Sequence, residues 1–301
     1  MPINRAALGQ QTGTYSHPVD ARWTMAYAAS LGDTAACYLD TTRSDGVVAH
    51  PLFSICPEWP VALASRDLLR ENGLTMDEQR RAVHATHDSH VLRLVRPGDV
   101  LHTQATVIGI ESRRPGAFVT ERFDTIDQHG ELVARTYHGM LLLGVDIVGE
   151  PPAEGIAAIV PTAPEARLEP VREQAIAIEP QLAHTYSECA RIWNPVHTDR
   201  AVALAAGLPD IILHGSATLA LAVSSIVAHE AGEEPARISR IGGEFRGMVF
   251  LPSTLRVSVG APQESAGALV VPFEAFNDRG EAALRHGHIT LTPPSDKLRD
   301  G

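Results

Sequence analysis

Hydrophobic and polar residues alternate along two separate parts of the chain, and this pattern predicts strands in both. The stretch Val119–Ile126 shows the alternation that a strand with one buried face requires. Strands are expected at residues 91–95, 100–111, 117–127 and 131–144, and again at 238–249, 254–262, 267–276 and 282–292. Each group follows segments with a helical pattern, at residues 20–39 and 55–72, then at 181–206 and 214–231. Helices followed by a run of strands favour an α+β fold with an antiparallel sheet.

The two parts also resemble each other in their spacing of polar and aromatic residues. The repeat pairs Tyr27 with Tyr186, Asp33 with Ile192 and Tyr38 with His197, at equal spacings along the chain. Asp127–Gly130 and Asn277–Gly280 both read as hairpin turns between alternating runs. Self-similarity of this kind indicates a duplicated domain.

A segment rich in proline, alanine and glutamate, residues 149–170, separates the two parts and is interpreted as a linker. The sequence therefore predicts an N-terminal domain at residues 1–148 and a C-terminal domain at residues 171–301.

Composition limits the classes of function. The chain has 301 residues and a formal charge of −11, which argues against a general nucleic-acid binder. Its three cysteines show no metal-binding spacing and no disulfide framework, which suits a reducing cytoplasm. No signal peptide is evident, and the apolar stretch Ala217–Val227 is too short to span a bilayer. We expect a cytoplasmic protein without a membrane partner.

Chemistry is concentrated in the segment Tyr186–His197 and shortly after it. Asn194-Pro195 fixes a bend, and a histidine placed just after such a bend can be aimed into a cleft. His197 could therefore give or take a proton near neutral pH. His214-Gly215 follows directly before a long apolar helix.

These residues resemble the signature of the MaoC-like hydratases and dehydratases, the (R)-specific enoyl-thioester hydratase group. The resemblance is carried by Tyr186, Asn194-Pro195, His197 and His214-Gly215. It implies a hotdog fold in each half, a long central helix wrapped by a curled antiparallel sheet, and hence a tandem double hotdog. It implies reversible addition of water to an enoyl group held as a CoA or acyl-carrier thioester, with no further cofactor.

The resemblance also assigns roles to residues. His197 becomes the acid/base, Asn194 shapes the loop that presents it, and Gly215 donates to the thioester oxygen. A helix N-terminus with free N–H groups suits the last role. His214 lies in the substrate-binding loop, where supporting the loop or capping the helix is favoured over direct chemistry. A single hotdog exposes a sheet edge that fusion can cover, and a homodimer of double hotdogs is left open.

The family segment usually places an aspartate where this chain has Ile192. Asp210, in the loop ahead of His214, is the first candidate to replace that carboxylate, and Asp33 is the second. Asp199 is interpreted as a helix cap. Two other interpretations are that His197 acts without a carboxylate partner, or that the site binds a thioester without catalysing its hydration.

Two alternative functions remain open on the sequence. One is a thioester-binding protein or partner subunit without hydratase activity. The other is a hotdog thioesterase, for which Glu58 or Glu230 would have to supply the carboxylate. The histidines of the segment His84–His90 are not assigned to a metal, because strand alternation would put His87 on the face opposite His84 and His90.

Overall fold

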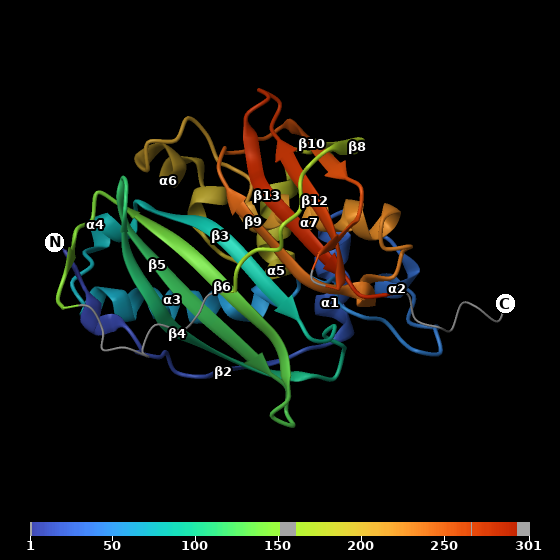
Figure 1. Cartoon of the computed structure of the whole chain (residues 1–301), viewed down its shortest axis with the longest axis horizontal. Coiled ribbons are helices and arrows are strands. Elements are labelled where there is room, and N and C mark those ends of the chain that lie inside the picture. The colour runs from blue at the N-terminus through green and yellow to red at the C-terminus, as the bar shows by residue number, and fades with distance from the viewer. Residues whose placement is uncertain (1, 151–160, 266, 294–301) are drawn as a thin grey trace.

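The computed structural model describes residues 2–150, 161–265 and 267–293 (Figure 1). The helices of the described part are α1 (Ala21–Ser30), α2 (Ala36–Leu39), α3 (Ile55–Glu71), α4 (Met76–Gln79), α5 (Leu182–Ala190), α6 (Arg200–Ala205) and α7 (Gly215–His229), with 3-10 turns η1 (Arg5–Ala7), η2 (Pro195–His197) and η3 (Pro235–Arg237). The first-half strands are β1 (Ile3–Asn4), β2 (Tyr15–Pro18), β3 (Ala82–Val91), β4 (Val100–Arg113), β5 (Gly116–Ile126), β6 (Leu132–Leu143) and β7 (Ile147–Val148). The second-half strands are β8 (Pro170–Ile178), β9 (Ile238–Phe245), β10 (Ser253–Gly260), β11 (Gln263–Ser265), β12 (Ala268–Phe276) and β13 (Ala282–Leu291).

One large antiparallel sheet joins the two halves. Its strand order is β2-β4-β5-β6-β3-β9-β13-β12-β10-β8, and β11 pairs with β12. Read from its two ends, this order is the same for both halves, so the pairing of β3 with β9 lies at the centre of a pseudo-twofold arrangement. In Figure 1 the strands of the two halves lie side by side. The chain is a tandem double hotdog of the α+β class, as the sequence predicted.

The pseudo-twofold arrangement is visible where the halves meet. Helices α1 and α5 pack against each other, and the rings of the repeated residues Tyr27 and Tyr186 lie tilted against each other with their hydroxyls 3.4 Å apart. The two predicted hairpin turns also match: the side chains of Asp127 and Asn277 each accept hydrogen bonds from backbone N–H groups of their own turn. Gly130 and Gly280 both take positive φ there, which glycine accommodates without strain.

Each half is built around a long helix, α3 or α7. Helix α7 is buried almost all round, which is why its sequence is apolar without a clear polar face. The main apolar core is continuous between the halves, because it contains residues of α1, α3, α5 and α7 and of the second-half strands. None of the described helices combines the length and the apolar content needed to cross a bilayer.

The predicted helices and strands differ from those of the structure in three ways. The first-half strand expected at 91–95 is wrong: β3 runs from Ala82 to Val91, so the histidine-rich segment is itself the strand. Strands β2 and β8, which form the two ends of the large sheet, were missed. The leading helical segments are each broken into two helices, at Gly32 in the first half and at Asn194-Pro195 in the second.

A bulge in β3 also corrects the expected faces of its histidines. The register against β6 shifts between His84 and Thr86. An extra residue reverses the alternation on one side of a bulge. His84 therefore lies with His87, their ring centroids 5.7 Å apart, and not with His90.

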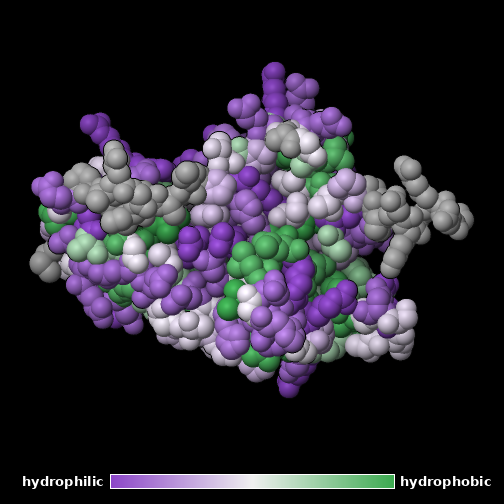
Figure 2. Space-filling view, turned by 60° about the horizontal axis from the view of Figure 1, so that its bottom comes forward, coloured by the Kyte–Doolittle hydropathy of each residue, from purple (hydrophilic) through white to green (hydrophobic). Residues whose placement is uncertain are grey.

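The predicted division of the chain at 149–170 stays a prediction. Residues 151–160 lie outside the described residues, and β8 begins at Pro170, the last residue of the expected linker. Figure 2 shows hydrophobic side chains gathered on the face that is turned forward, with hydrophilic ones around them. A surface of that kind can hold a partner, but the expected homodimer also stays a prediction.

Candidate active site

Local backbone geometry places His197. Helix α5 ends at Arg191, which takes the left-handed conformation with φ of 59°, and the next N–H, from Ile192, donates back to the carbonyl of Ser187. This is the ending that turns a chain sharply away from a helix. Asn194 then begins the 3-10 turn η2, and its carbonyl accepts from the N–H of His197. Asn194 thus shapes the loop through its backbone, since its side chain makes no capping hydrogen bond.

The hydrogen bond made by His197 fixes its tautomer. The Nδ1–H donates to the carbonyl oxygen of Ile212 at 2.9 Å, so Nε2 carries the lone pair. Burial lowers the pKa of His197 to about 4, which keeps the ring neutral at physiological pH. A neutral imidazole with a free Nε2 can accept a proton from water.

His214 lies directly against His197 and is held from the other side. The two rings stack with centroids 3.7 Å apart. The Nε2 of His214 lies 3.1 Å from the hydroxyl of Ser187 and 3.4 Å from the carbonyl of Ile192. Burial lowers its pKa well below the ordinary value, so it too is neutral. His214 makes no capping bond to helix α7, and its contacts are those of a residue that supports the His197 loop.

Gly215 is the first residue of α7, and its surroundings are crowded on one side. The first N–H groups of a helix have no partner within it. A Cβ at Gly215 would lie 3.0 Å from a ring carbon of Phe245, at the end of β9. One residue further on, Ser216 accepts a hydrogen bond from the hydroxyl of Tyr186 at 3.1 Å. Phe245 therefore packs against the side of Gly215 where a Cβ would stand, and it can do so because Gly215 has no side chain.

Ile192 occupies the position of the family aspartate and is buried in the apolar core. In the described part of the chain, no carboxylate contact is found at His197. Asp210, the first candidate replacement, instead lies 3.3 Å from Arg200 and accepts from its neighbouring backbone N–H. The structure therefore does not bring Asp210 to His197, and we do not carry it into the mechanism. Asp199 caps helix α6, as interpreted from the sequence.

Asp33, the second candidate, belongs to a different cluster in the first half. Its carboxylate accepts from the N–H of Ala35 and also from Ser224 of α7. The hydroxyl of Ser224 lies 3.2 Å from Nε2 of the buried His50. The Nδ1 of His50 accepts from the N–H of Leu52, so its Nε2–H is the donor to Ser224. Asp33 thus ends a hydrogen-bond chain that runs from His50 through Ser224 of helix α7, and this chain does not include His197.

The arginines that could neutralise CoA phosphates already have partners. Arg191 covers the ring of Trp23 at 3.9 Å, whereas the others pair with carboxylates: Arg240 with Asp88, Arg246 with Glu244 and Arg256 with Glu173. Arg191, Arg246 and Arg256 remain exposed and accessible to a ligand, whereas Arg240 keeps only 14% of its side-chain surface exposed.

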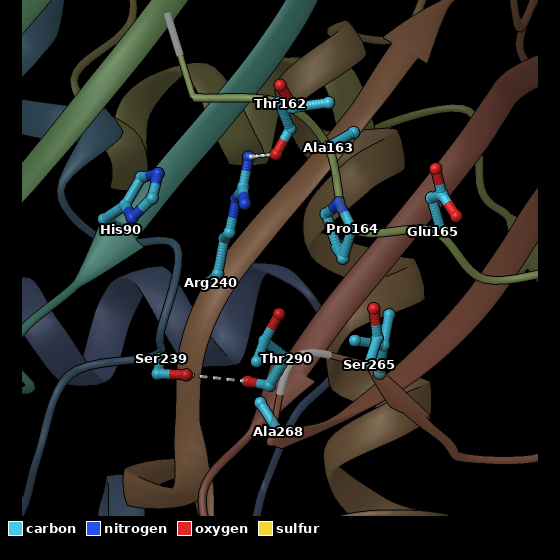
Figure 3. A pocket seen from close by; sticks show the side chains of 11 residues that line it. His90, Thr162, Ala163, Pro164, Glu165, Ser239, Arg240, Ser265, Ala268 and Thr290 are labelled. Atoms are coloured by element: carbon cyan, nitrogen blue, oxygen red, sulfur yellow. Dashed lines mark hydrogen bonds between the residues drawn. The ribbon is translucent and has the colours of Figure 1, made fainter.

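A cavity of about 620 Å³ lies elsewhere, between the central strands and residues 162–165 (Figure 3). His90 and Arg240 line it together with Ser239 and Thr290. None of the residues expected at the active site borders this cavity. It is an open surface depression whose main cation, Arg240, is held by Asp88 through two hydrogen bonds.

Sequence reasoning missed three residues of the site: Ser187, Ser216 and Phe245. Ser187 lies one residue after Tyr186, and Ser216 one after Gly215, so their spacing from the recognised motif is the only available cue. Phe245 comes from a strand of the sheet, and only the folded chain shows that it touches Gly215.

Two family models match the chain, one in each half. Residues 162–267 match the MaoC like domain, and residues 6–136 match the FAS1-like dehydratase domain region. Among solved structures, a MaoC-like dehydratase from Phytophthora capsici aligns with 96% of this chain and 97% of its own, with a TM-score of 0.80 and 20% identity. A Mycobacterium tuberculosis protein described as a double hotdog fold gives a TM-score of 0.60 at 16% identity, with 94% of each chain covered.

The fold and the His197 loop thus define a double-hotdog protein with a hydratase-like site. Its second half carries a MaoC like domain, and its first half matches the FAS1-like dehydratase domain region.

Two curated relatives are named for related activities. The peroxisomal multifunctional enzyme type 2 of Drosophila melanogaster is 29% identical over 159 residues, which is 53% of this chain and 26% of that protein. The enoyl-CoA hydratase ChsH3 of Mycobacterium tuberculosis is 35% identical over 90 residues, 30% of this chain and 31% of that protein. The aligned segments span less than a third of the length of either relative.

Gly215→Ala tests the close approach at the start of α7. The φ of Gly215 is not positive, so alanine is tolerated by the backbone, but the new methyl group would press on Phe245. Displacing a bound thioester even slightly is expected to lower kcat/KM for an enoyl-CoA roughly tenfold or more. Gly13→Ala is the matched control, because a Cβ there meets nothing within 4 Å. Equal values of kcat/KM for the two variants would show that Gly215 is not part of the active site.

Proposed function

We propose that this protein catalyses the reversible hydration of an enoyl thioester, with His197 as acid/base and Gly215 as the donor to the thioester oxygen. The observation that carries the proposal is the fixed tautomer of His197, whose Nε2 lone pair is free while its ring stacks on His214, the residue before Gly215. The names of two relatives, an enoyl-CoA hydratase and a peroxisomal multifunctional enzyme, agree with this reaction class.

In the proposed reaction, His197 takes a proton from water as the water oxygen bonds to the β-carbon of the enoyl group. The electron pair of the double bond moves toward the thioester carbonyl, and the N–H of Gly215 stabilises the enolate oxygen. The imidazolium of His197 then returns the proton to the α-carbon. Water is added in total, and the reverse sequence removes it.

The removal of His197 from water bears on its strength as a base. Desolvation disfavours a positive charge on its ring, and the stacked neutral His214 supplies no negative charge to offset this. The pKa of about 4 therefore makes His197 a weaker base than an unperturbed histidine. We infer a slower reaction than one in which a carboxylate supports the histidine.

Binding without turnover is the second candidate function, and Ile192 favours it. An apolar side chain at this position can neither bind a proton nor orient water. A protein of this kind would hold an acyl thioester for a partner. The thioesterase reading has less support, because Glu58 is buried against Thr136 and Glu230 is paired with Arg172.

Turnover of crotonyl-CoA, followed by the loss of enoyl absorbance, separates hydration from binding alone. Release of free thiol in the same assay would indicate a thioesterase. A cytoplasmic location stays a prediction of the sequence, and some relatives carry "peroxisomal" in their names.

Ile192→Asp tests whether the site lacks only its carboxylate. We expect turnover of crotonyl-CoA to appear or to rise, because the new side chain would share the catalytic water with His197. Placing a carboxylate in this apolar position costs stability, so the thermal midpoint should fall. Ile192→Asn, which has nearly the same shape but no charge, is the control. A fast wild type that Ile192→Asp slows would show that the protein uses another arrangement.

A further inference from the structure

A row of polar side chains crosses the inner face of the first half of the sheet. Strand pairing places Gly243 opposite His87, His87 opposite His138, and His138 opposite Glu121. Ser65 of helix α3 donates to the carboxylate of Glu121, so the row faces the long helix and not solvent. The inner face of a hotdog sheet normally packs against its helix with apolar residues, so a row of this kind needs an explanation.

His87 has no partner for either of its ring nitrogens. It is 2% exposed, and both Nδ1 and Nε2 are buried without a hydrogen bond from the described residues. A neutral imidazole carries one donor and one acceptor, and each costs about 1–3 kcal/mol when buried unpaired. A protein keeps such a residue at this cost only when something else satisfies it.

Contacts connect this row to the proposed active site. The ring of His84 lies 3.9 Å from that of His138 and 4.5 Å from that of Phe245, between centroids. Phe245 is the side chain that a Cβ at Gly215 would touch. His84, His138 and Phe245 are all partly exposed, although they lie on the inner face, so the space beside them is open. An acyl group whose thioester lies at Gly215 would pass Phe245 and reach these histidines.

We propose that the first half binds the distal part of the acyl group and that His87, with His84 beside it, hydrogen-bonds an oxygen carried there. This inference rests on the proposed function, since it takes Gly215 as the place of the thioester. The substrate class is then an enoyl thioester with a hydroxyl or keto group on its chain, and not a plain alkyl chain.

The chemistry of the row selects an uncharged oxygen. Glu121 is nearby and would repel a second carboxylate, and neutral imidazoles offer no charge to hold one. A metal ion is not supported, since the described residues contain no group of three histidine, cysteine or acidic side chains arranged to bind one. A hydroxyl can accept from the N–H of His87 and donate to Nδ1 of the neighbouring His84, whose Nε2–H is directed at the carbonyl of Thr86.

The test compares pairs of acyl chains that differ only in a terminal hydroxyl, over a series of chain lengths. Turnover of the trans-2-enoyl-CoA esters gives kcat/KM, and calorimetric binding of the saturated acyl-CoA esters gives Kd without any reaction. In the wild type, the hydroxylated ester should be preferred about tenfold at one chain length in both measurements. In His87→Leu this preference should fall to about one.

His90→Leu is the matched control, because His90 lies on the same strand but faces the opposite side of the sheet, toward Asp88. It should keep the wild-type preference. His87→Asn, which retains a donor and an acceptor with a shorter reach, serves if the leucine variant does not fold, and it should weaken the preference. Absence of turnover with a preserved binding preference would contradict the proposed hydratase but not this inference. No preference at any length, or one unchanged by both His87 variants, would overturn it.

Discussion

His197→Ala is expected to lower kcat for hydration of an enoyl-CoA by about 10²–10⁴-fold, the usual contribution of a general acid/base. The loss should fall on kcat more than on KM, since the imidazole acts on water and on the α-carbon and not on the CoA group. The fold should survive, because the ring makes a single hydrogen bond, to the carbonyl of Ile212, and lies in a loop.

The measurement is steady-state turnover of crotonyl-CoA, with circular dichroism to confirm folding. His129→Ala is a suitable control, because His129 lies exposed in the hairpin turn that follows β5. A well-folded His197→Ala protein with near wild-type turnover would exclude the mechanism proposed here. A wild type without turnover, whose affinity for an acyl-CoA falls in His197→Ala, would instead favour the binding function.

Acidification is expected to destabilise the folded protein strongly below about pH 6.5. Burial lowers the pKa values of His50 and His87 to about 3. Above pH 6.5 both states of the protein hold these rings neutral, and they contribute no pH dependence. As the pH falls from 6.5 toward 3, only the unfolded chain takes up the protons, so the free energy of unfolding decreases by about 1.4 kcal/mol per pH unit for each histidine.

Glu58 raises the free energy of unfolding as the pH falls over part of this range, and so opposes the effect of the histidines. Burial raises its pKa to about 8, so between pH 8 and 4.5 the folded state is the one that holds the extra proton. Its contribution cancels that of one histidine down to about pH 4.5. Counting these three groups alone, the net loss is roughly 1.4 kcal/mol per pH unit from 6.5 to 4.5 and about twice that below.

Urea unfolding followed by circular dichroism at several pH values measures this slope. His50→Gln should reduce it by about 1.4 kcal/mol per pH unit between pH 6.5 and 4.5, whereas His129→Gln should leave it unchanged. A wild-type stability that stays flat or rises as the pH falls over this interval would mean that His50 and His87 do not both have lowered pKa values in the folded protein.

The duplicated architecture was predictable because its determinants are local in the sequence. The turns at Asp127–Gly130 and Asn277–Gly280 and the spacing from Tyr27 and Tyr186 are visible without tertiary information. The strand β3 was misplaced because its inner face carries His87 and Ser89 where the pattern of a buried strand requires apolar residues. For this reason the predicted strand began only at residue 91.

Only the residues of the local motif in the site were predictable from the sequence. Asn194-Pro195 and His197 lie within a few residues of one another, so their geometry follows from local backbone preferences. The partners Ile212, His214 and Phe245 reach His197 and Gly215 from other loops and strands. For the same reason Asp210 appeared close to the site in sequence, although its actual neighbour is Arg200.

The paired tyrosines at the junction of the halves show that two related domains in one chain need not keep identical contacts at equivalent residues. Two identical hydroxyls on a twofold axis cannot both donate to each other. Here Tyr186 donates to Ser216, so the remaining proton between the pair must come from Tyr27. The two equivalent tyrosines therefore have different positions in one hydrogen-bond chain: Tyr27 is at its end and Tyr186 is in its middle. In a dimer of separate chains any substitution appears twice, whereas here each half can change independently of the other.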